Sequence, residues 1–248
     1  MADDPARQDR AHAFDRGAQE YRRARPSYPD DAVRWCVPAG SHQVLDLAAG
    51  TGKLTAVLVA HGFDVTAVEP SRAMREQLHS LLPDVTARPG TAEDIGLPSA
   101  AVDAVTVAQA WHWFDETAAS AEIARVLRPG GTLGLLWNLR DPSTDWVARF
   151  GEIIHRGDTH EREPAAPQLG EHFDEPERAT FAWTDRVAVR TLRTLAASRS
   201  HVLTLTPPRR EELLDAVEEL TRTHPDLRGR DEVELPYRTV CWRAQVRR

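Results

Sequence analysis

Along the chain, apolar positions form two kinds of pattern. Some are short unbroken runs, and others are stripes that repeat at helical spacing. Residues 44–47 and 101–108 are short, mostly apolar runs, which predict buried parallel strands. Residues 71–82 and 209–223 are predicted helices, and in the second of them Leu213, Val217 and Leu220 form an inward-facing stripe. Residues 180–187 alternate in the manner of an edge strand, and 233–246 are predicted to form a final strand.

The first predicted strand leads into a helix through a glycine loop, within Val44–Lys53. Gly50 and Gly52 permit backbone conformations that side chains disfavour. Apolar residues continue at helical spacing from Leu54. Because a helix N-terminus offers unpaired N–H groups and the positive end of a dipole, this arrangement predicts a nucleotide cradle.

The spacing of the loop separates three kinds of ligand. A phosphate-binding P-loop is excluded, because Leu47 and Leu54 occupy the outer positions of that motif. A dinucleotide fingerprint requires a third glycine, and Thr55 stands at that place, which weakens NAD or FAD without excluding them. S-adenosylmethionine (SAM), which has no pyrophosphate, is the remaining candidate.

An acid follows the second predicted strand, residues 63–69. Glu69 lies 17 positions after Gly52, close to the place where such folds put the carboxylate that binds ribose hydroxyls. An ionised carboxylate can accept from both hydroxyls. In the alternative interpretation, Glu69 only caps the helix at 71–82.

The stretch Asp46-Leu-Ala-Ala-Gly-Thr-Gly52 resembles the acidic, glycine-rich motif of class I SAM-dependent methyltransferases of the type 11 group, with Ala48 at the first glycine. The turn Leu-Arg-Pro-Gly-Gly at 127–131, before a strand predicted at 133–137, is common in the same group. The resemblance is specific over 21–137. It implies an α/β, Rossmann-like fold: a seven-stranded, mostly parallel sheet with helices on both faces and a helical lid.

The resemblance also implies a cofactor site for SAM. Tyr21 and Arg25 would lie near the methionine carboxylate, although a solvated charged helix is an equally open interpretation of that segment. Thr91 stands where the family often has an aspartate that accepts from the adenine amino group. The cofactor residues implied are Tyr21, Arg25, Ala48, Gly50, Thr51, Gly52, Glu69, Pro70, Thr91, Ala92, Glu93 and Gln109.

We expect residues 1–248 to form a single methyltransferase domain. Within it, 1–40 would be lid helices, 41–140 the SAM-binding core, and 141–248 the substrate-side helices and closing antiparallel strands. The net charge of −7 disfavours a nucleic-acid partner. No signal peptide or membrane-spanning run is recognisable, so we expect a cytoplasmic protein without a membrane partner.

No cysteine framework or metal motif is recognisable. Cys36 and Cys241, at opposite ends of the chain, predict neither a disulfide nor a zinc set. The spacing of His155, His160 and His172 matches no helical metal pair, so we expect no metal.

The candidate chemistry follows the strand at 101–108, whose carboxyl end would border the ligand crevice. His112 is a candidate general base, or else packs among its aromatic neighbours; if the segment is extended, it points away from them. Tyr28, Trp111 and Trp113 would line an acceptor pocket. We therefore expect SAM-dependent methylation of a small organic molecule at a hydroxyl or carboxylate. The alternative is a SAM-binding protein with a non-methylating role, such as a cyclase or a non-catalytic partner.

Overall fold

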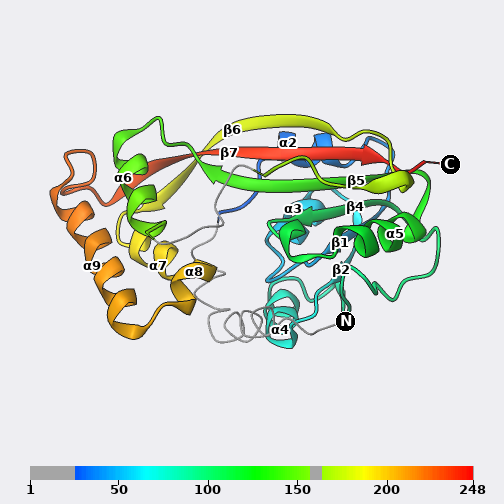
Figure 1. Ribbon diagram of the computed structural model, residues 1–248, viewed down its shortest axis with the longest axis horizontal. Coiled ribbons are helices and arrows are strands. Elements are labelled where there is room, and N and C mark those ends of the chain that lie inside the picture. Colours follow the sequence, from blue (N-terminus) through cyan, green and yellow to red (C-terminus); the bar gives the residue numbers. More distant parts are fainter. Residues whose placement is uncertain (1–25, 157–163, 248) are drawn as a thin grey trace. The chain divides into compact units, whose positions relative to one another are not determined.

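The computed structural model describes residues 26–156 and 164–247. Its strands form one seven-stranded sheet in the order β3-β2-β1-β4-β5-β7-β6 (Figure 1). The strands are β1 (Gln43–Leu47), β2 (Asp64–Val68), β3 (Thr86–Arg88), β4 (Val102–Ala108), β5 (Leu127–Arg140), β6 (Glu177–Ala188) and β7 (Glu232–Gln245). The described helices are α2 (Asp30–Cys36), α3 (Lys53–Ala60), α4 (Arg72–Leu81), η1 (Trp111–Trp113), α5 (Glu116–Val126), α6 (Asp145–Ile154), η2 (Gly170–His172), α7 (Thr191–Ala197), α8 (Ser200–Thr204) and α9 (Pro207–Thr223).

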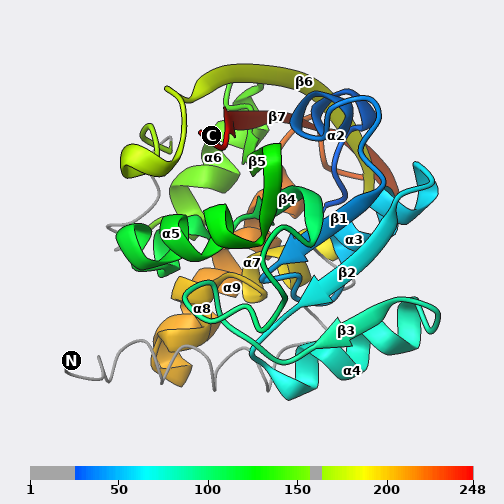
Figure 2. The ribbon, with the colours of Figure 1, turned by 90° about the vertical axis from the view of Figure 1, so that its right-hand side faces the viewer.

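The sheet is parallel from β3 through β5 and becomes antiparallel at β7. β1 pairs in parallel with both β2 and β4, so their carboxyl ends meet at one edge (Figure 2). The arrow of β7 points against that of β5 in Figure 1. Backbone bonds from Val246 to Gly131 and from Asp141 to Pro236 set this antiparallel register. The seven-stranded, mostly parallel sheet is confirmed.

Helices cover both faces of the parallel strands. Val44 and Ala104 contribute to a buried cluster that includes residues of α2 and α3. Their neighbours Leu45 and Val105 face the opposite way, into a cluster that includes residues of α5. Figure 2 shows α3 and α5 on opposite sides of β1 and β4. Strands buried on both faces explain the unbroken apolar runs in the sequence.

The chain divides into two compact units. One consists of 27–138, 164–181 and 239–247 and contains β1–β4 and α2–α5. The other includes, among its described residues, 139–156 and 182–238, with α6, α7 and α9. In this second unit Phe150, Leu192 and Val217 belong to one buried cluster. The division expected at residues 40 and 140 stays a prediction.

Two expectations about local structure are revised. β5 begins at Leu127 rather than Leu133, because the Pro-Gly-Gly turn is incorporated into the strand with a register shift against β4. Gly130, with a φ of 78°, permits that irregularity. The helix expected at 191–203 is broken into α7 and α8. The predicted lid includes residues 1–25, which lie outside the described residues. No helix in 26–156 or 164–247 has both the length and the apolar character needed to cross a membrane.

Candidate active site

The loop between β1 and α3 passes through three residues with positive φ. Ala48, Gly50 and Gly52 have φ values of 55°, 57° and 85°. The N–H of Gly52 donates to the C=O of Ala49 at 3.0 Å, which closes the turn. A Cβ added to Gly52 would lie 2.9 Å from Cγ of Leu78, so α4 packs directly on the loop backbone. Position 52 therefore requires glycine for its conformation and for this close approach.

The Glu69 carboxylate ties the glycine loop to the start of α4. Its Oε2 accepts from Gly50 N–H at 2.9 Å, and its Oε1 accepts from Ser71 N–H at 2.8 Å. Ser71 caps α4 itself, since its hydroxyl accepts from Met74 N–H at 3.2 Å. A carboxylate has about four lone-pair directions, which is more than these two bonds use. Holding the loop and binding ribose are thus compatible roles, and the second stays a prediction. The adjacent Pro70 is exposed.

Asp46, the acid of the motif, is buried at the carboxyl end of β1. It is 1% exposed and accepts from the Thr55 hydroxyl at 2.6 Å. Burial raises the pKa of Asp46 to about 7, the Thr55 hydrogen bond opposes this, and the charge of Glu69 adds to it. The hydrogen bond between Asp46 and Thr55 attaches α3 to β1. A dinucleotide-binding loop would have its third glycine at position 55, where this chain has the hydroxyl that makes this attachment.

The residues of the loop fit SAM. Thr51 is 2% exposed, and within the described part of the chain its hydroxyl has no hydrogen-bond partner. Buried polar groups are nearly always satisfied, so a ligand at this loop would complete the hydroxyl's bonding. The start of α3 has no side-chain cap, which leaves its N-terminal dipole directed at the loop. The predicted role of Glu69, accepting from the ribose hydroxyls, stays a prediction.

The segment predicted to frame adenine forms a tight turn. Thr91 N–H donates to Asp94 C=O at 3.0 Å, and the Thr91 hydroxyl accepts from Asp94 N–H at 3.2 Å. Ala92 is buried in the core. Glu93 accepts from Asp115 N–H at 3.0 Å, which connects the turn to the start of α5. Asp115 caps α5, as predicted. The roles of Thr91, Ala92 and Glu93 in binding adenine stay predictions.

Gln109 follows β4 with a φ of 58°, a left-handed conformation that is uncommon for a residue with a long side chain. Its Nε2 donates to Asn138 C=O at 3.1 Å. The Asn138 amide accepts from the Thr239 hydroxyl at 2.6 Å and donates to Ser27 C=O at 2.8 Å. Asn138 therefore joins the ends of β4 and β5 to the segment that leads into α2.

The aromatic segment after β4 is a 3₁₀-helix, η1, so the expectation of an extended chain is wrong. Trp111 is buried in the core and lies edge-on to Phe114, with ring centroids 5.7 Å apart. The exposed His112 ring lies 4.6 Å from that of Trp113, so it does not point away from its neighbours. Tight i to i+3 winding places Trp111 and Phe114 on one side. His112 as a base, and Trp111 and Trp113 as pocket walls, stay predictions.

The N-terminal candidates are described only in part. Tyr28 packs against the buried cluster that contains α2 and α3. Tyr21 and Arg25 lie outside the described residues.

The chain is similar in sequence to known methyltransferases over nearly its full length. The sequence profile of a methyltransferase domain, type 11, matches residues 45–135. An uncharacterised methyltransferase of Mycobacterium tuberculosis is 46% identical over 241 residues, covering 97% of this chain and 98% of that protein. The chain belongs to the class I SAM-dependent methyltransferases. Prediction of the family from the glycine loop is thereby confirmed.

Two further proteins are similar to this methyltransferase. The solved structure of a putative type II methyltransferase from Anaeromyxobacter dehalogenans has a TM-score of 0.62 and 27% identity, and it covers 90% of this chain and 97% of its own. An O-methyltransferase of Aspergillus sclerotiorum is 33% identical over 128 residues, covering 47% of this chain and 48% of that protein.

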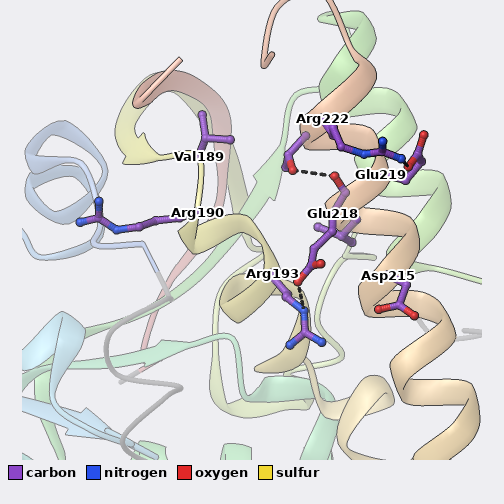
Figure 3. Close-up of a pocket in the computed structure, with 9 residues that line it drawn as sticks. Val189, Arg190, Arg193, Asp215, Glu218, Glu219 and Arg222 are labelled. Carbon is purple, nitrogen blue, oxygen red and sulfur yellow. Dashed lines mark hydrogen bonds and ion pairs between the residues drawn. The ribbon is translucent and has the colours of Figure 1, made fainter. Parts of the chain in front are cut away.

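The second unit of the methyltransferase contains a separate hollow of about 540 Å³ (Figure 3). Its lining is largely charged, and none of the predicted site residues belongs to it. Arg193 of α7 reaches Glu218 of α9 at 2.6 Å and Glu211 at 2.8 Å. These ion pairs hold α7 against α9, so the charged residues around the hollow have a structural role.

Sequence reasoning missed Arg75 and Asn138 as supports of the site. Arg75 donates to the carbonyl groups of Glu69 and Pro70 at 2.7 and 2.8 Å and so fixes the turn after β2. The position of Arg75, one turn into α4, is a sequence feature from which this contact with the turn could have been predicted. Asn138 offered none, because its partners Ser27, Gln109 and Thr239 are far away in sequence.

Proposed function

We propose that this methyltransferase binds SAM and transfers its methyl group to a small organic molecule through a hydroxyl or carboxylate oxygen. The observation that carries the proposal is the Glu69 carboxylate, which holds the loop at Gly50, next to a buried Thr51 hydroxyl that has no hydrogen-bond partner among the described residues. The likeness to an O-methyltransferase over about half the chain supports an oxygen acceptor.

The chain's own residues would bind and align rather than activate the donor. SAM supplies a methyl group already activated by its sulfonium. Glu69 would accept from the ribose hydroxyls, and the uncapped N-terminus of α3 would lie against the polar part of the ligand. Alignment of acceptor and donor, with exclusion of water, supplies most of the remaining rate enhancement.

A proton must leave a hydroxyl acceptor, and His112, which is exposed on η1, would receive it. Neutral imidazole would take the proton on a ring nitrogen. A carboxylate acceptor carries no proton at neutral pH and needs no base. The effect of His112 therefore distinguishes the two acceptor classes.

The test is methyl transfer from SAM bearing a trideuterated methyl group to pooled small phenols, alcohols and carboxylic acids, read by mass spectrometry. The proposal expects a product carrying the labelled methyl. With a hydroxyl acceptor, His112→Ala lowers turnover about 10²–10⁴-fold without changing SAM affinity. His79→Ala, at an exposed position in the last turn of α4, is the matched control. Tight SAM binding with rearranged but unlabelled products would instead support the cyclase alternative.

A further inference from the structure

The fold brings the two cysteines of the chain together, contrary to the expectation from their sequence positions. Cys36 ends α2, and Cys241 lies inside β7. Both are free thiols, both are 0% exposed, and both belong to the same buried cluster.

The register of β5 with β7 explains this proximity. Cys241 lies opposite Leu136, and Gly134 is the next position of β5 on the same face. A Cβ added to Gly134 would lie 2.6 Å from Cβ of Cys36. The missing side chain therefore creates the space in which Cys36 rests on the sheet, beside Cys241.

The residue before Cys36 is held on the same strand. Arg243 donates to Trp35 C=O at 3.1 Å, and its guanidinium lies 4.5 Å from the centroid of the Trp35 ring. The end of α2 is thus attached to β7 at two successive residues. This contact fixes the approach of the two thiols.

The surroundings keep the pair unreactive while α2 stays in place. Burial raises the pKa of the Cys36 thiol well above its ordinary value, and the contact with Cys241 raises it further. The thiolate is the reactive form, so the thiols can react only when α2 moves. Cys36, at the end of a seven-residue helix, is reached first, because β7 lies between two other strands.

We propose that Cys36 and Cys241 form a reversible modification site, an intramolecular disulfide that fastens α2 to β7 on exposure to a small-molecule disulfide. The Cys36 thiolate attacks one sulfur of that disulfide, forms a mixed disulfide and releases one thiol. The Cys241 thiolate then attacks Sγ of Cys36 and releases the second thiol. Two protons leave the protein, and its two electrons reduce the small disulfide to two thiols.

The test incubates the folded full-length protein with oxidised glutathione, then alkylates it in denaturant with N-ethylmaleimide for intact-mass analysis. The expected product is a monomer that takes up no label, has lost two hydrogens, and yields a peptide joining Cys36 to Cys241. Because the bond closes a long loop, Tm should rise by about 5–15 °C with an unchanged circular dichroism spectrum. Reduction should reverse the shift.

Cys36→Ser and Cys241→Ser are matched controls, and neither should gain stability from the same treatment. Arg243→Gln loosens the contact with Trp35 and should speed oxidation of the pair. Two alkylated thiols after prolonged treatment, disulfide-linked dimers, or two separate glutathione adducts would each overturn the proposal. So would a bridged species with a lowered Tm, because that bond would not fit the native fold.

Discussion

The paired strands β1 and β4 carry one acid near each end of the pair, and the two acids are in opposite electrostatic environments. At the amino end, Asp103 accepts from His42 and Gln43 N–H at 2.8 and 2.9 Å and from the Arg128 guanidinium. Burial acts to raise its pKa, but these hydrogen bonds prevail and hold the pKa at about 2.

At the carboxyl end, Asp46 has its pKa raised to about 7. Its neighbour Glu69 accepts one hydrogen bond from Gly50 in the glycine loop and one from Ser71 at the start of α4. The loop contains Ala48 in the left-handed conformation. The amino end thus stabilises an ionised carboxylate through hydrogen bonds, while the carboxyl end contains an acid whose ionised form is disfavoured by burial. This division agrees with the rule that ligands bind at the carboxyl ends of open α/β sheets.

The largest expected effect is on the pH dependence of stability through Asp46. Its folded pKa of about 7 exceeds the usual value of 3.8. The folded state therefore binds the proton more tightly than the unfolded state does. This contribution to stability is fully present below about pH 4 and is lost as the pH rises to 7. The free energy of unfolding of the wild type minus that of Asp46→Asn should fall by up to about 1.4 kcal/mol per pH unit in this window. Urea unfolding at several pH values measures it.

Asp103→Asn is the control at the other end of the strands. Its folded pKa of about 2 lies below the usual 3.8, so its contribution to stability is present above about pH 4 and is lost as the pH falls toward 2. Parallel pH profiles for wild type and Asp46→Asn between pH 4 and 7 would contradict the account of Asp46.

A smaller effect is expected from the packing of the glycine loop. Gly52→Ala introduces a side chain at φ 85° and a contact of 2.9 Å with Leu78. Gly62→Ala, at φ 83° with no atom of the described residues within 4 Å, has the same conformational strain without the contact. Thermal unfolding should show Gly52→Ala to be less stable than Gly62→Ala by about 1–3 kcal/mol. Equal losses would mean that α4 yields, and that close packing does not fix the loop.

The smallest effect concerns two alanines in the left-handed region. Ala48, in the site loop, and Ala100, just before the amino end of β4, have φ values of 55° and 52°. Replacing either by glycine removes strain but adds freedom to the unfolded chain, so each should stabilise by about 1 kcal/mol or less. Only Ala48→Gly should also alter affinity for S-adenosylhomocysteine, measured by calorimetry. An equal change of affinity in Ala100→Gly would break the distinction between the two ends.

The sequence predicted the features that depend on short stretches of chain. The glycine loop, the helix cap at Asp115 and the inward stripe of α9 at Leu213 and Val217 are local patterns, and the structure confirms them. The position of Glu69 at the end of the second strand was predicted from its spacing after the glycine loop.

The features that escaped prediction depend on contacts between distant segments. Asp103 meets His42 across two strands, and Cys36 meets Cys241 only because β7 returns beside β5. The shape of η1 also escaped, since an aromatic run after a strand does not distinguish extended chain from a 3₁₀ turn. The local sequence propensities of these segments do not distinguish the observed arrangements from the alternatives.

Calorimetric titration of S-adenosylhomocysteine into wild type, Glu69→Gln and Asp103→Asn tests the central claim most directly. Glu69→Gln replaces the carboxylate at the loop by a neutral amide, and hydrogen bonds to a charged group are worth about 1.5–3 kcal/mol. The account predicts that the dissociation constant rises about 10- to 150-fold for Glu69→Gln. It predicts a change of less than about twofold for Asp103→Asn, at the opposite end of the sheet. Unchanged affinity in Glu69→Gln, or equal losses in both variants, would contradict the assignment of the carboxyl end as the ligand site.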